Sequence, residues 1–221
     1  MATVIAVRGN AEQRIEPELG AVSLSVGVSE SERNRAMSRT TEAHERLIAA
    51  VRELEASGAL DSWSAGQLRV WAHRPWNAEG KQLPMVHQTS AEIEVVFTDL
   101  EKLGEWVSRV SIGNAVALGG IDWRLTDATR KRVQELAQRD AVADAVAKAA
   151  VYASALGLGT PSPVELADTG LLTAHPVPQG GGERMFAMRA VADTGGGGAE
   201  FTPAKLVIEA SVDARFSAEP A

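Results

Sequence analysis

The residue types that most often do chemistry are scattered through this chain of 221 residues. His44 stands between acidic residues of a charged helical stretch, which predicts a solvated surface position. His73 and His87 flank one loop, where a loose metal site is the sharper alternative. His175 precedes a proline and is predicted to lie in a turn. No His-Glu-x-x-His motif and no cysteine occur, so we expect no metal, no cofactor and no cysteine nucleophile.

Paired carboxylates and glycine runs offer two further candidates. Asp140 and Asp144 share one helical face, but Lys148 continues the same stripe, so a surface ion pair between Asp144 and Lys148 explains it better. The runs 180–182 and 195–198 lack the Gly-Lys-Ser/Thr ending of a phosphate loop and are predicted to be flexible. No Gly-x-Ser-x-Gly elbow occurs. We therefore predict no catalytic residues.

The aromatic side chains are unusual in type, because five tryptophans accompany a single tyrosine. Packing in the core or in an interface is the default for such residues. Trp76 lies within the polar, proline-containing connection between His73 and Gln88, and Trp71 lies just before it. They are the candidate contacts for a small ligand or a partner protein in the loop 73–88.

Composition restricts the class of protein and of partner. The hydrophobic fraction of 45% is ordinary for a globular protein, whereas a net charge of -7 argues against nucleic acid as a partner. No apolar run is long enough to span a membrane. The start, Met1 to Arg8, lacks the basic segment and long apolar run of an export signal, which predicts a cytoplasmic location.

Hydrophobic periodicity predicts alternating strands and helices. Val22, Leu24, Val26 and Val28 alternate with serine and glycine, as in a strand buried on one face. A strand ending at a Gly9-Asn10 turn precedes it, and a helix capped by Ser29 or Ser31 and running to about Ser57 follows. The remaining expected strands are 68–71, 91–97, 115–125, 161–164 and 204–216, with a short helix that starts after Asp99.

The most informative element is a long helix, capped by Thr126 or Asp127 and closed by Gly157. Nearly every position from Ala141 to Ala155 is apolar and small, which predicts burial on more than one side. Two interpretations remain open: a central helix within one domain, or a helix shared with a neighbouring subunit. The candidate subunit contacts are Ala143, Ala147 and Ala150.

A long segment rich in glycine and proline, about 169–200, is expected to be mobile or to fold only against a partner. Its glycines raise the entropy cost of ordering, and it has few apolar anchors. Limited proteolysis is expected to cut there first.

Three segments together resemble the SIMPL-domain family. The opening residues 4–11 and 17–26 are similar to that family's first two strands. Gly119-Gly120-Ile121-Asp122-Trp123, followed by the alanine-rich helix, resembles its central strand and long helix. Residues 201–212 are similar to its last strand.

The resemblance implies an α+β fold, with a mixed or antiparallel sheet packed against two long helices in a single domain over 1–217 and a tail at 218–221. It also implies a homo-oligomer and an association with oxidative-stress defence, with no established catalytic residues. We therefore expect a non-enzymatic, self-assembling protein. A binding module for a small molecule or a partner protein is the alternative, and an uncharacterised hydrolase is the third hypothesis.

Overall fold

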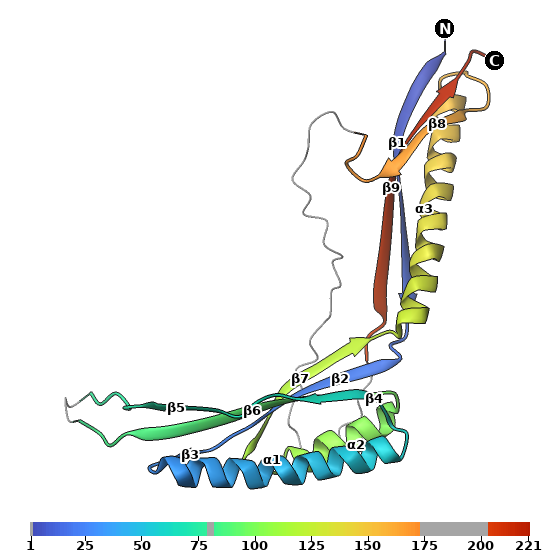
Figure 1. The fold of residues 1–221 in the computed structure, drawn as a ribbon. Helices are drawn as coiled ribbons and strands as arrows, with labels where there is room; N and C mark the ends of the chain where they lie inside the picture. The colour runs from blue at the N-terminus through green and yellow to red at the C-terminus, as the bar shows by residue number, and fades with distance from the viewer. Residues whose placement is uncertain (1, 79–81, 173–202) are drawn as a thin grey trace. The chain divides into compact units, whose positions relative to one another are not determined.

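The computed structural model describes residues 2–78, 82–172 and 203–221 (Figure 1). It contains helices and antiparallel strands, so the predicted α+β class is confirmed. Contacts divide the chain into two compact units, which we describe separately as the α3 unit and the two-helix unit. The single domain expected over 1–217 stays a prediction. The described residues of the α3 unit are 2–16, 125–172 and 205–221, and those of the two-helix unit are 17–78, 82–124 and 203–204.

The α3 unit is a three-stranded sheet with one long helix along it (Figure 1). β9 (Leu206–Ala218) lies between β1 (Thr3–Ile15) and β8 (Ser162–Asp168) and pairs antiparallel with both. The two ends of the chain are therefore neighbours, because β1 and β9 pair along all thirteen of their residues. α3 (Asp127–Ala155) packs against β1 and β9.

The two-helix unit is a six-stranded antiparallel sheet in which β6 is the central strand. On one side β6 pairs with β2 and β3, and on the other with β4 and β5. Helices α1 and α2 pack on one face (Figure 1). The bounds are β2 (Leu19–Val26), β3 (Ser29–Glu30), α1 (Arg33–Ala56), β4 (Leu60–Ala65), β5 (Arg69–His73), β6 (Val86–Phe97), α2 (Leu100–Val110) and β7 (Val116–Arg124).

Apolar side chains of alternate strand positions form the core of the two-helix unit. Val22 and Val26 of β2, and Val95 and Phe97 of β6, are completely buried. Trp106 of α2 packs against Phe97 with ring centroids 5.3 Å apart. This burial pattern confirms that β2 has one face directed into the core, as its alternating sequence predicts.

Two of the three described helices begin at the capping residue that the sequence predicts. The side chains of Asp99 and Thr126 accept hydrogen bonds from backbone amides in the first turns of α2 and α3. Gly157 follows α3 with a φ of 70°, as expected for a helix stop. For α1 the prediction was wrong, because the helix begins after Glu32 with no side-chain cap.

The predicted turn at Gly9-Asn10 is also wrong. β1 continues through both residues to Ile15. Gly9 is needed for space, because a Cβ atom there would lie 1.9 Å from the carbonyl oxygen of Ala141 in α3. This glycine therefore marks the closest approach of a helix to a strand, a role that sequence alone does not distinguish from a turn.

The finer expectation, one sheet against two long helices, is not confirmed. The described residues form two sheets and three helices, with α3 in one unit and α1 and α2 in the other. The difference arises from pairing: β1 pairs with β9, whereas β2 pairs with β6 and β7. Hydrophobic periodicity locates strands but does not specify their partners.

Candidate functional site

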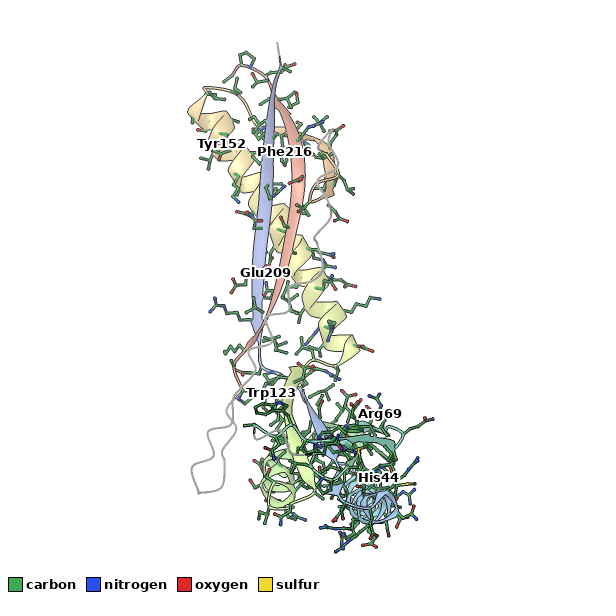
Figure 2. The ribbon with its side chains drawn as sticks, turned by 90° about the vertical axis from the view of Figure 1, so that its left-hand side faces the viewer. His44, Arg69, Trp123, Tyr152, Glu209 and Phe216 are labelled. Carbon is green, nitrogen blue, oxygen red and sulfur yellow. The ribbon has the colours of Figure 1, made fainter. Side chains whose placement is uncertain are left out.

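α3 contacts the sheet of its unit through alanines that recur at every fourth residue. Ile5 of β1 and Phe216 of β9 are the large side chains that meet them, and Figure 2 labels Phe216. Each buried methyl group contributes only about 0.8 kcal/mol, so stability here depends on close approach over several turns. The buried alanines are Ala137, Ala141, Ala145, Ala149 and Ala153.

A polar stripe of α3 binds the backbone of β1. The Asp144 carboxylate accepts a hydrogen bond from the backbone amide of Asn10 at 2.8 Å. Lys148 donates to the carbonyl oxygen of Arg8 at 3.0 Å and to Asp144 at 2.6 Å. The Lys148 hydrogen bond, together with the Asn10 amide, holds the pKa of Asp144 below its ordinary value. The predicted Asp144–Lys148 ion pair is confirmed, and it also binds the strand beside it.

The outer face of α3 is apolar and exposed. Ala143, Ala147 and Ala150, the predicted subunit contacts, all lie exposed on this helix. Larger apolar side chains accompany them, and the exposed fractions of Val146 and Val151 are 48% and 65%. Burial of α3 on more than one side is therefore not seen within the described part of the chain. We use the name outer face for Ala143, Val146, Ala147, Ala150 and Val151.

Charge is scarce on this part of the α3 unit. From Ala141 to Val164 the sequence has only two charged residues, Asp144 and Lys148, and both are bound to β1. Leu166 of β8 pairs with Ala214, which faces α3, so Leu166 lies on the same side of the sheet as the helix. Its side chain is also exposed. The outer face and Leu166 are thus both apolar and exposed, and no described element covers either of them.

The two candidate tryptophans are exposed and do not form a joint site. Trp71 lies on β5 and is 45% exposed, whereas Trp76 follows that strand and is 86% exposed. No ring contact joins them within the described residues. Part of the loop 73–88, residues 79–81, lies outside the described residues. Trp106 and Trp123 are core residues, in line with the default interpretation.

The candidate metal ligands are not brought together. His73 pairs with Val86, and His87 pairs with Ala72, so the two histidines occupy neighbouring register positions and point to opposite faces of the β5–β6 ribbon. His44, labelled in Figure 2, is half-buried on α1, and its Nε2 atom is buried without a hydrogen-bond partner. Within the described residues, no cluster of three potential metal ligands is found. His175 lies outside them.

A partly buried ion pair, with Asp213 buried and Arg8 half-exposed, lies on the face of the α3-unit sheet opposite the helix. The two carboxylate oxygens of Asp213 accept hydrogen bonds from Nε and Nη2 of Arg8, at 2.7 and 3.2 Å. The backbone amide of Gly170 donates to the same carboxylate at 2.8 Å. The Arg8 hydrogen bonds, helped by that amide and opposed by burial, hold the pKa of Asp213 below its ordinary value.

Replacing Asp213 with asparagine is expected to lower the free energy of unfolding of the α3 unit by about 1–3 kcal/mol at pH 7. The lower end is expected, because the Arg8 side chain is half-exposed and remains solvated. Since the folded pKa lies below the unfolded one, the carboxylate stabilises the fold above the unfolded value of about 3.9. The difference between the two proteins should shrink as the pH falls through the lowered pKa, in urea unfolding followed by circular dichroism.

Glu165→Gln is the matched control, because Glu165 forms an exposed ion pair with Arg215 in the same sheet. It should change the free energy of unfolding by less than about 1 kcal/mol. A D213N protein as stable as the wild type at pH 7, or a difference that does not change with pH, would contradict this account of Asp213.

No helix among the described residues is both long and apolar enough to cross a membrane. α3, the longest, consists of 29 residues but is interrupted by charged side chains in its first half.

Comparison with known proteins agrees with the resemblance in the sequence. A comparison with curated proteins found no match. A protein-family model described as SIMPL, protein of unknown function (DUF541), matches residues 5–216. The match extends over both units, from Ile5 in β1 to Phe216 in β9. The chain therefore belongs to the SIMPL family.

Proposed function

We propose that this protein is a non-enzymatic, self-assembling protein whose copies associate through the outer face of α3. The observation that supports the proposal best is the exposure of this helix surface, whose side chains are apolar, small and uncharged. A second copy of the protein could cover this surface and remove its apolar side chains from water. Small side chains also allow the backbone of a second helix to approach closely, which increases van der Waals contact.

The size of the surface sets the expected strength of association. From Ala143 to Val151 the helix extends over about 12 Å, and a stripe about 10 Å wide gives roughly 120 Å². Stable interfaces bury about 800 Å² on each partner. The outer face therefore needs further residues around it to form a stable contact, and the assembly should depend on protein concentration.

The experiment compares Ala147→Arg with the wild-type protein by light scattering coupled to size exclusion. The subunit mass is 23.3 kDa. The wild type should give a multiple of this mass. The variant should give the subunit mass with an unchanged far-ultraviolet spectrum, because Ala147 is exposed and its replacement disturbs only the contact.

Gln138→Arg is the matched control, since it adds the same side chain at another exposed position of α3. It should assemble as the wild type does. An A147R protein that keeps the wild-type mass would show that the outer face is not the contact.

A second candidate function rests on the exposure of Trp76 and Trp71. In this alternative, the loop 73–88 binds a small molecule or a partner protein, and ligand binding should quench tryptophan fluorescence. A role in oxidative-stress defence is a further part of the proposal, taken from the family resemblance. The hydrolase hypothesis has no support from a described cluster of candidate catalytic residues.

A further inference from the structure

β1 is an edge strand, because β9 is its only strand partner among the described residues. Such a strand has a row of backbone amides and carbonyls that face away from the sheet. An exposed row of this kind is a template for a strand from another molecule. The β1 edge is thirteen residues long and contains no proline, so every one of its residues keeps a backbone amide. Its charged side chains, Arg8, Glu12 and Arg14, give it part of the protection that edge strands need.

Side chains of α3 bind backbone groups on this edge. The Asn10 amide donates to Asp144, and the Arg8 carbonyl accepts from Lys148. Both backbone groups therefore point away from β9, where an added strand would have to bind. One turn earlier on α3, Asp140 accepts a hydrogen bond from the Gln13 side chain at 2.6 Å.

The position of α3 beside this edge depends on small residues. Gly9 lies between the two bound backbone groups, and a Cβ atom there would also lie 2.8 Å from Cβ of Ala145. With glycine, the helix comes close enough for the short Asp144 side chain to reach the Asn10 amide.

We infer that Asp144 and Lys148 guard the edge of β1 against the addition of a strand from a second copy of this chain. Each occupies a backbone group that the incoming strand would need, and the ion pair between them at 2.6 Å holds both side chains in place. This role goes beyond the proposed function, since it concerns a contact that is prevented and not one that is formed.

The other edge of the same sheet is protected differently. β8 contains Pro163, which has no amide hydrogen to donate, and the register shifts between Pro163 and Glu165. Proline and bulges are common means of blocking strand addition. With both edges protected, contact between copies of the α3 unit through strand addition is disfavoured at either side of this sheet.

The test uses the double variant Asp144→Ala/Lys148→Ala, which we call the guard variant. It removes both side chains that bind the β1 edge and leaves the net charge of the protein unchanged. Glu135→Ala/Arg139→Ala is the matched control, because it also removes one acidic and one basic residue four positions apart on the exposed surface of α3. Both pairs are made in the Ala147→Arg background, so that association through the outer face does not contribute.

Two measurements are expected to change only in the guard variant. Hydrogen exchange at the Asn10 amide should become at least about tenfold faster, since its acceptor is lost. On incubation, thioflavin fluorescence and scattered mass should rise several-fold as strands add at β1. The control should match the A147R parent in both measurements.

The inference is wrong if the Asp144→Ala/Lys148→Ala variant stays at the subunit mass and its thioflavin fluorescence equals that of the A147R parent. It is also wrong if thioflavin fluorescence and scattered mass rise equally in the control variant. If the double variant fails to fold, Lys148→Ala alone can be tested, because it frees only the Arg8 carbonyl. This variant should also show a rise in thioflavin fluorescence and scattered mass, smaller than that expected for the double variant. Because the background lacks the outer-face contact, these outcomes do not depend on whether the wild-type protein assembles. Failure of the proposed function would show separately, as a wild-type protein at subunit mass.

Discussion

Replacing Gly9 with alanine is expected to destabilise the α3 unit by about 3 kcal/mol, at the upper end of the range for overpacking. The added Cβ atom would lie 1.9 Å from the Ala141 carbonyl oxygen, which is backbone and has no rotamer to change. α3 would have to move away from β1, and the hydrogen bonds of Asp144 and Lys148 would lengthen with it. Urea unfolding followed by circular dichroism measures the loss.

The expected loss of stability is the opposite of what a glycine-to-alanine substitution in a strand usually causes. Alanine in place of glycine in a strand normally stabilises by about 0.5–1 kcal/mol, because glycine loses more entropy on folding. Gly9 does not have a positive φ, so only the lack of space explains the penalty. Gly159→Ala is the control, since its nearest contact would be an ordinary 3.5 Å to the Glu219 carbonyl oxygen. A G9A protein as stable as the control would contradict the described approach of α3 to β1.

The second large effect is expected for Ala145→Arg. Ala145 is completely buried between α3 and β1, so the substitution would place a long charged side chain where no partner is available. Burying an unpaired charge costs several kcal/mol, and the steric cost adds to it. The total approaches the 5–15 kcal/mol by which whole domains are stable. We therefore expect the α3 unit to be unfolded at 25 °C, with a loss of helical signal in circular dichroism.

Ala147→Arg is the control for this variant, because it introduces the same side chain two residues further along the same helix. Ala147 is exposed, so that variant should keep its full helical signal. Equal unfolding of both variants would contradict the assignment of an inner and an outer face to α3.

Much of the secondary structure could be predicted from periodicity and caps. α3 was located to within about a residue, because Thr126 and Gly157 are strong local signals. β4 was missed: its sequence, Leu60 to Ala65, has no β-branched residue and reads as a polar loop. β1 was predicted too short, because a glycine next to an asparagine is the usual signal of a turn.

Residue contacts between distant segments could not be predicted from one sequence. The Asp144–Lys148 spacing predicted their ion pair, yet the chain offers no local sign that β1, more than 130 residues earlier, lies beside it. Arg8 and Asp213, separated by 205 positions, were likewise not singled out. Such pairs follow from the pairing of β1 with β9, and this pairing is set by the whole fold.

The candidate site could be predicted in part. The small apolar character of Ala141–Ala155 pointed to a close contact, and the structure assigns every fourth residue of it to the sheet. The exposed remainder includes Ala143, Ala147 and Ala150, so the helix positions selected from the sequence are available for contact with another molecule. The segment 169–200, by contrast, is described only as far as Leu172, and its expected mobility stays a prediction.

The central claim is that the outer face of α3 joins copies of this protein, and the mass of the wild-type chain in solution tests it most directly. Sedimentation velocity should be measured over about a hundredfold range of concentration, because an interface of modest area dissociates on dilution. The account predicts a species at a multiple of 23.3 kDa that gives way to the single subunit at low concentration. A single species of 23.3 kDa over the whole range would contradict it.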